Sequence, residues 1–177
     1  MFLSLKNVKR VERGMIIIEQ YRDKWLAEKV DEFIGFYNRE FFCLDNFSSF
    51  GFIYNGIYYQ TVEHAYQSLK FKDVAPEIEK KIIECFSAYD AQRIAHEHIE
   101  RQSASWDEDK VMIMEQLLRA KLAQHSYVKK KLLETADYLI CEDSPKDSFW
   151  GIGKDRKGQN HLGKLWMKLR SEIRNYK

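Results

Sequence analysis

Residues 50–70 read FGFIYNGIYYQTVEHAYQSLK, and they join a predicted hairpin to a predicted helix. Asn55-Gly56 separates two runs rich in aromatic and β-branched residues, and this dipeptide accepts the positive φ angles of a type I′ turn. We therefore predict strands at 50–54 and 57–60. Thr61 can cap a helix that buries one face, because apolar residues follow it at i, i+3, i+4 and i+7. These residues are Val62, Ala65, Tyr66 and Leu69.

Further helices are predicted on the C-terminal side of this stretch. Pro76 suits a first helical turn, Asp90 can cap the next helix, and Ser105 precedes a third. A short helix is expected at 126–134, a strand at 138–141, and a last helix from about His161. The apolar residues expected to face the core are Ile78, Ile82, Ile83, Phe86, Ile94, Ala95, Ile99, Val111, Met114, Leu117, Leu118, Leu122, Leu162, Leu165, Trp166, Leu169 and Ile173.

The composition favours one compact α+β domain, mostly helical with a small β-sheet. The chain has 177 residues, of which 45% are hydrophobic and 32% charged, with 8 glycines and 2 prolines, and this excludes collagen-like and low-complexity chains. We predict an N-terminal extension at 1–32, with a helix around 25–33, and a domain at 33–177. The apolar run at 15–18 is too short for a membrane span, and the three cysteines match no disulfide framework, so a cytoplasmic protein is expected.

The net charge of +2 is unevenly distributed along the chain. Residues 150–177 contain 8 Lys and Arg against 2 Asp and Glu, a net +6, whereas residues 1–149 contain 21 against 25, a net −4. The total therefore does not indicate a nucleic-acid binder, but the basic C-terminal end can attract phosphate. A polyanionic small molecule is the partner that this distribution favours.

Glu63 is the first candidate for chemistry. It lies two residues after Thr61, in the first helical turn, where the helix dipole stabilises an ionised carboxylate. Gln67 and Lys70 follow at i+4 and i+7, on the same side of the helix. The alternative is a solvated helix face on which Glu63 only stabilises the helix.

The second candidate is the long polar segment at 143–160. It contains Trp150 and glycines 151, 153 and 158, and its basic residues and the amides at the start of the next helix could receive phosphate. The segment is neither a Walker loop nor a dinucleotide fingerprint. The alternative is a glycine-rich turn whose Trp150 fills the core.

Other residue groups give weaker signals. Trp106, just before a helix, could belong to the core or stack on a flat base. The two histidines of His96-Glu97-His98 are two residues apart, which does not suit a zinc helix, so we expect a solvated face and no metal. Cys43 lies among aromatics and is expected to be buried.

Three stretches together resemble the NADAR family, the YbiA-like N-glycosidases. They are residues 44–48 (LDNFS), residues 61–71 (TVEHAYQSLKF), and residues 147–153 with 158–167 (DSFWGIG and GQNHLGKLWM). Trp106, Lys110, Met114 and Lys121 also match. Asp45 departs from the family, which more often has serine there.

The resemblance implies hydrolysis of an N-glycosidic bond, without a metal or cofactor. The implied substrates are phosphoribosylamino-pyrimidine intermediates of riboflavin biosynthesis, split into the base and ribose 5-phosphate. A carboxylate suits this reaction because positive charge develops on the ribose carbon. The implied catalytic residues are Glu63, Asp147 and Trp106, with the roles of the two acids left open. The implied substrate-binding residues are Asn46, Phe47, His64, Gln67, Lys70, Trp150, Gly151, Gly153 and Asn160.

Two alternatives stay open at this point. One is removal of ADP-ribose from modified guanine in nucleic acid, for which the basic C-terminal end could help binding. The other is a non-catalytic module that binds ADP-ribose. The oligomeric state is left open as well, and no membrane partner is expected.

Overall fold

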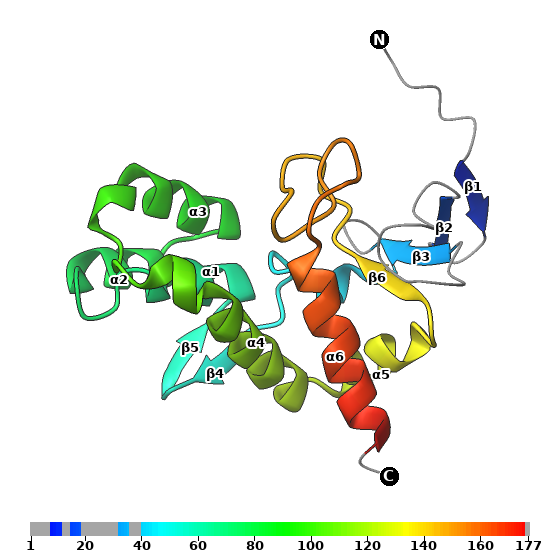
Figure 1. Ribbon diagram of the computed structural model, residues 1–177. Coiled ribbons are helices and arrows are strands. Elements are labelled where there is room, and N and C mark those ends of the chain that lie inside the picture. Colours follow the sequence, from blue (N-terminus) through cyan, green and yellow to red (C-terminus); the bar gives the residue numbers. More distant parts are fainter. Residues whose placement is uncertain (1–7, 12–14, 19–31, 36–39, 176–177) are drawn as a thin grey trace. The chain divides into compact units, whose positions relative to one another are not determined.

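The computed structural model describes residues 8–11, 15–18, 32–35 and 40–175. They form two compact units, one of residues up to Asp45 together with those from Lys130 onward, the other of Asn46–Lys129. The elements are shown in Figure 1. They are mainly helices with two small sheets, which confirms the predicted α+β class.

The unit of residues 46–129 begins with the predicted hairpin. Strands β4 (Phe52–Tyr54) and β5 (Ile57–Tyr59) pair antiparallel, with Phe52 opposite Tyr59. Asn55 and Gly56 have φ angles of 50° and 81°, as a type I′ turn requires. The hairpin prediction is confirmed.

Four helices complete this unit. They are α1 (Val62–Leu69), α2 (Pro76–Ile83), α3 (Ala88–Glu97) and α4 (Trp106–Gln124), and a 3₁₀ turn, η3 (Ile99–Arg101), follows α3. Helix α1 packs against α2, α3 and α4 (Figure 1). One buried cluster between α1, α2 and α3 consists of Phe71, Ala75, Ile78, Ile82, Ala91, Ile94 and Ala95. Helix α1 is therefore the central element of this unit.

The start of α3 differs from the prediction. Ser87, not Asp90, is the N-cap, and its Oγ accepts from the Asp90 amide at 3.1 Å. The Ser87 hydroxyl also donates to the Asp90 carboxylate at 2.7 Å, so that Asp90 lies in the first turn. Phe86 and Ile99 are 93% and 48% exposed, so their predicted burial is wrong. Both lie just outside the helices whose periodicity suggested burial.

The other unit contains a four-stranded sheet. Its order is β1 (Val8–Val11), β2 (Met15–Ile18), β3 (Glu32–Gly35), β6 (Leu139–Cys141). Strands β1, β2 and β3 pair antiparallel in sequence, whereas β3 and β6 pair parallel. Most of the helix predicted at 25–33 lies outside the described residues, but Phe33 belongs to β3, where the helix prediction is wrong. The division after residue 32 stays a prediction.

Helix α6 (His161–Asn175) packs on β6 within this unit. Trp166 is fully buried, and its indole N–H donates to the carbonyl of Leu44, the last residue of the 3₁₀ turn η2 (Phe42–Leu44). Arg170 is also buried and donates to Thr135 and to the carbonyl of Tyr138. Helix α5 (Ser126–Glu134) has the predicted bounds.

The structure also bears on the membrane and on the cysteines. Among the described residues, no helix is both long and apolar enough to cross a membrane. All three cysteines are unbonded, and Cys43 and Cys141 are buried. The expected burial of Cys43 is confirmed.

Candidate functional site

Glu63 is held at the N-terminal end of α1 by capping interactions. The Thr61 hydroxyl accepts from the amide of His64, and the amide of Glu63 donates to the carbonyl of Asn46 at 3.1 Å. The preceding loop thus provides acceptors for two of the first-turn amides, which have no partner within the helix. This network fixes Glu63 in the turn where the dipole favours negative charge.

Glu63 is buried, which excludes the solvated-face alternative. Its exposed fraction is 5%, and every residue from Val62 to Ser68 is buried. Gln67, one turn later and 6% exposed, donates from Nε2 to Glu63 Oε1 at 2.7 Å. A buried carboxylate needs such partners, because desolvation penalises the charge.

Lys70 and two aromatic rings lie at the other end of α1. The ammonium of Lys70 lies 5.4 Å from the centre of the Tyr66 ring and 5.8 Å from the centre of the Trp106 ring. The two rings meet edge to face, with centroids 5.0 Å apart, and both are buried. Burial lowers the pKa of Lys70, while the negative charge of Glu63 opposes that shift. Lys70, the C-cap of α1, and Glu63, in its first turn, therefore interact electrostatically.

His64 is held by two internal hydrogen bonds. Its Nε2 lies 3.3 Å from the carbonyl of Cys85, so this nitrogen must carry the proton. Its Nδ1, 2.9 Å from the Thr61 hydroxyl, then accepts from that hydroxyl. Burial lowers the pKa of His64, which matches a neutral ring. Both ring nitrogens are thus hydrogen-bonded within the chain. Substrate binding by His64 stays a prediction.

The loop before the hairpin provides the other predicted contacts of this unit. Asn46 is 8% exposed, and its Nδ2 points to the sulfur of Met114 at 3.7 Å. Phe47 is half-buried and packs edge to face on Tyr89, with ring centroids 5.0 Å apart.

Lys121 is a buried polar residue that periodicity alone does not reveal as special. It follows Leu117 by four positions on the apolar side of α4, and none of it is exposed. Its ammonium donates to Ser48 Oγ at 2.8 Å and lies 5.6 Å from the centre of the Phe50 ring. The sequence signal that could have identified Lys121 as a buried polar residue is its position within an otherwise apolar stripe of α4.

In the other unit, Asp147 shapes the loop between β6 and α6. Its Oδ1 accepts from the amides of Phe149 and Trp150 at 2.8 and 2.7 Å. A Cβ on Gly151 would lie 2.7 Å from the carbonyl oxygen of Glu142, and one on Gly158 would lie 2.4 Å from that of Gly151. Close backbone packing therefore requires these glycines. Gly153 has a φ of 68°, which favours glycine for a different reason.

Asn160 joins this loop to the sheet. Its Oδ1 accepts from the amide of Glu142 at 3.0 Å, and its Nδ2 donates to the carbonyl of Ile140 at 2.9 Å. The amides of residues 160, 161 and 162 donate to the carbonyls of residues 151, 149 and 150. The prediction that amides at the start of this helix receive phosphate is wrong for these three, because the loop already uses them.

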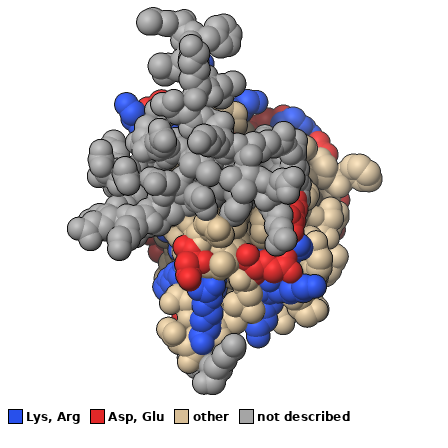
Figure 2. Space-filling view, turned by 90° about the vertical axis from the view of Figure 1, so that its right-hand side faces the viewer, with Lys and Arg blue, Asp and Glu red and all other residues tan. Residues whose placement is uncertain are grey.

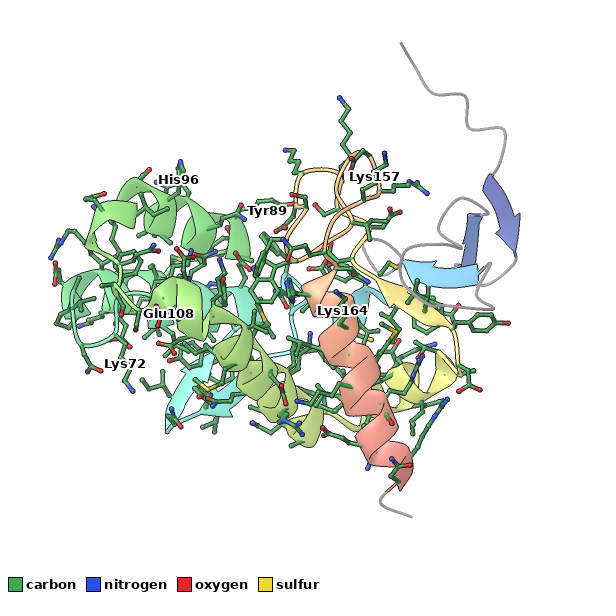
Figure 3. The ribbon with its side chains drawn as sticks, viewed as in Figure 1. Lys72, Tyr89, His96, Glu108, Lys157 and Lys164 are labelled. Atoms are coloured by element: carbon green, nitrogen blue, oxygen red, sulfur yellow. The ribbon has the colours of Figure 1, made fainter. Side chains whose placement is uncertain are left out.

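The basic residues of this loop differ in their surroundings. Lys157 extends from the loop (Figure 3), and Lys154 is also exposed. Arg156 is half-buried, and its guanidinium lies 4.0 Å from the carboxylate of Asp143. The pKa of Asp143 is raised above its ordinary value because burial outweighs the opposing effect of that guanidinium. Trp150 is half-buried and packs edge to face on Phe149, so it does not fill the core completely.

The predicted site residues thus form two groups. The unit of residues 46–129 contains Asn46, Phe47, Glu63, His64, Gln67, Lys70 and Trp106. The other unit contains Asp147, Trp150, Gly151, Gly153 and Asn160. His96 lies on the exposed side of α3 (Figure 3), and the described residues contain no cluster of three or more His, Cys, Asp or Glu able to hold a metal.

Comparisons with known proteins place these features in a family. Residues 21–174 match the NADAR domain. The N-glycosidase Npun_R5314 of Nostoc punctiforme is 39% identical over 136 residues, covering 75% of this chain and 86% of that protein. The N-glycosidase YbiA of Escherichia coli is 31% identical over 145 residues, covering 81% and 89%.

A longer relative and a solved structure agree with these matches. The riboflavin biosynthesis protein VVA0006 of Vibrio vulnificus is 33% identical over 133 residues, which are 75% of this chain but 36% of that protein. The NMR structure of E. coli YbiA matches with a TM-score of 0.74 and 30% identity, covering 81% of this chain and 86% of that one. The chain therefore belongs to the NADAR domain family.

Proposed function

We propose that this protein is an N-glycosidase that hydrolyses phosphoribosylamino-pyrimidines of riboflavin biosynthesis to the free base and ribose 5-phosphate. The buried carboxylate of Glu63, fixed at the start of α1 and hydrogen-bonded to Gln67, carries the proposal. The N-glycosidase class is supported by the names of the Nostoc and E. coli relatives, and the substrate by the name of the Vibrio relative.

The proposed reaction uses Glu63 without a metal. The bond between ribose C1 and nitrogen breaks with its electron pair leaving on nitrogen, which takes up a proton. Positive charge develops on C1, and water adds there as it loses a proton. A preorganised carboxylate stabilises that charge or accepts the proton of water, and it does so most strongly where bulk water is excluded.

The other residues have supporting roles in the proposal. The ammonium of Lys70 neutralises negative charge near the site, and the Trp106 ring provides a flat apolar wall beside it. Asp147 stays a predicted second acid, either a base for water or a partner of a ribose hydroxyl. Its present role is to cap the amides of Phe149 and Trp150.

Replacing Glu63 by Gln tests the proposal. The amide has nearly the same shape but no charge, so we expect release of free base from a phosphoribosylamino-pyrimidine to fall at least about 100-fold. Glu108→Gln is the matched control, because Glu108 is also a first-turn glutamate, on α4, but is exposed (Figure 3). Its activity should stay within twofold of the wild type. Full turnover by Glu63→Gln would refute the assignment.

The ADP-ribose alternatives are tested by the same assay with other ligands. The positive charge of the C-terminal end, which could help nucleic-acid binding, is partly neutralised in the structure by acidic side chains. Arg174 pairs with Asp137, and acidic and basic side chains lie side by side on the face shown in Figure 2. Release of ADP-ribose from modified guanine in DNA would favour the first alternative, and intact recovery of bound ADP-ribose the second.

A further inference from the structure

Two buried side-chain amide oxygens, on residues that are hydrogen-bonded to Glu63, have no hydrogen-bond partner within the described part of the chain. They are Asn46 Oδ1 and Gln67 Oε1, on side chains that are more than nine-tenths buried. Buried polar atoms in folded proteins are nearly always paired, and an exception has a cause such as a ligand contact. Both atoms belong to residues that are hydrogen-bonded to Glu63, the catalytic candidate, which favours a ligand contact.

The orientation of the Gln67 amide follows from its partner. Its Nε2 lies 2.7 Å from Glu63 Oε1, and an ionised carboxylate can only accept hydrogen bonds. The NH₂ group must therefore face Glu63, which leaves Oε1 as the unpaired atom. Gln67 thus presents an acceptor, not a donor.

Asn46 is linked to Glu63 through the main chain. Its carbonyl accepts from the Glu63 amide at 3.1 Å, while its Nδ2 points to the Met114 sulfur. Both unpaired oxygens therefore belong to residues hydrogen-bonded directly to Glu63. Acceptors in this position recognise O–H or N–H groups of a ligand and disfavour carbonyl oxygens.

We propose that Gln67 Oε1 and Asn46 Oδ1 form an acceptor pair that selects a ligand carrying hydrogen-bond donors beside the bond that Glu63 acts on. The inference rests on the proposed function, whose substrate carries two kinds of donor, ribose hydroxyls and amino groups on the base. Both oxygens are buried, so a donor reaches them only when neighbouring side chains move. A ligand without the donor then leaves a buried acceptor unpaired, which weakens binding about 10- to 100-fold.

The test uses pairs of ligands that the enzyme does not need to split. One pair is ribose 5-phosphate and 2-deoxyribose 5-phosphate, and the other is an aminopyrimidine and the same ring with methyl in place of amino. Dissociation constants are measured by calorimetry on the full chain as wild type, Gln67→Met and Asn46→Leu. Gln92→Met, on the exposed side of α3, is the control.

In the wild type and Gln92→Met, loss of the donor should weaken binding about 10- to 100-fold in at least one pair. In Gln67→Met or Asn46→Leu, the difference within that pair should fall below about threefold, because the acceptor is gone. The responding pair identifies the donor as ribose hydroxyl or base amino group. The inference is overturned if the wild type shows no difference in either pair, or if both variants keep the full difference.

Two features keep this result separate from other failures. If a variant does not fold, the wild-type comparison still decides, since equal binding within both pairs contradicts the inference. A hydrolysis assay on the same protein tests the proposed function independently. If binding depends on the donor but no hydrolysis is found, the proposed function is refuted and the inference about the acceptor pair still holds.

Discussion

The ammonium of Lys121 donates a hydrogen bond to the hydroxyl of Ser48 at 2.8 Å, and the lysine side chain is completely buried. This contact joins α4 to the loop that contains Asn46, within one compact unit. The loop is therefore tied to the core by a charged group, and removing that group affects both stability and the position of Asn46.

Lys121→Ala should lower the free energy of unfolding by about 2–5 kcal/mol, because it leaves a cavity and removes the buried hydrogen bond to Ser48. Urea denaturation followed by circular dichroism measures the change. Lys129→Ala, at an exposed position, should change stability by less than about 0.5 kcal/mol. Equal effects of the two substitutions would contradict the importance of the buried contact.

Gln67→Glu should move the acid limb of the pH–rate profile to higher pH. The substitution places a second carboxylate about where Nε2 lies, 2.7 Å from Glu63 Oε1, and two carboxylates so close share one proton. Activity that needs ionised Glu63 is then lost at a higher pH than in the wild type. The profile of kcat/KM between pH 4 and 9 measures this, and an unshifted acid limb would show that the amide does not control the carboxylate.

His64 should make the protein less stable as the pH falls below about 6.5. Burial lowers the folded-state pKa below the ordinary value of 6.5, so the unfolded chain binds the proton more readily. Stability is complete above that value and decreases as the pH falls from it toward the folded-state pKa. His64→Gln should show a smaller decrease between pH 7.5 and 5 in urea denaturation. His96→Gln, at an exposed site, should behave as the wild type does.

Gly163→Ala should disrupt the contact between α6 and β6. A Cβ at this position would lie too close to the carbonyl oxygen of Ile140 and 2.5 Å from Asn160 Oδ1. Because the backbone at Ile140 or at Gly163 must move, we expect the free energy of unfolding to fall by more than about 3 kcal/mol. In contrast, Gly56→Ala has open space and should cost about 1–2 kcal/mol from its positive φ alone. Thermal melting of both variants compares the two causes.

Features that depend on neighbouring residues were predictable from the sequence. The Asn55-Gly56 turn and the Thr61 cap need only a few adjacent side chains, and both were found as predicted. The start of α3 was missed because Ser87 and Asp90 can both act as caps, and the choice depends on where the chain turns. Local signals do not decide between them.

Features that depend on distant residues could not be predicted in the same way. The amide of Glu63 bonds to the distant carbonyl of Asn46 and its side chain is buried, whereas the helix pattern around Glu63 alone was compatible with a solvated face. The loop after β6 looked open to phosphate because its glycines and basic residues are visible in the sequence. That the amides at 160–162 are already used follows only from the three-dimensional course of the loop.

The parallel pairing of β3 with β6 has a consequence for synthesis on the ribosome. Gly35 pairs with Cys141, so one edge of β3 has no strand to pair with until the whole of residues 46–129 has been made. Those residues form a unit from contiguous sequence, which can fold as soon as it emerges. The edge of β3 that later receives β6 then remains unpaired for longest, and a chaperone that binds nascent chains would find its target there.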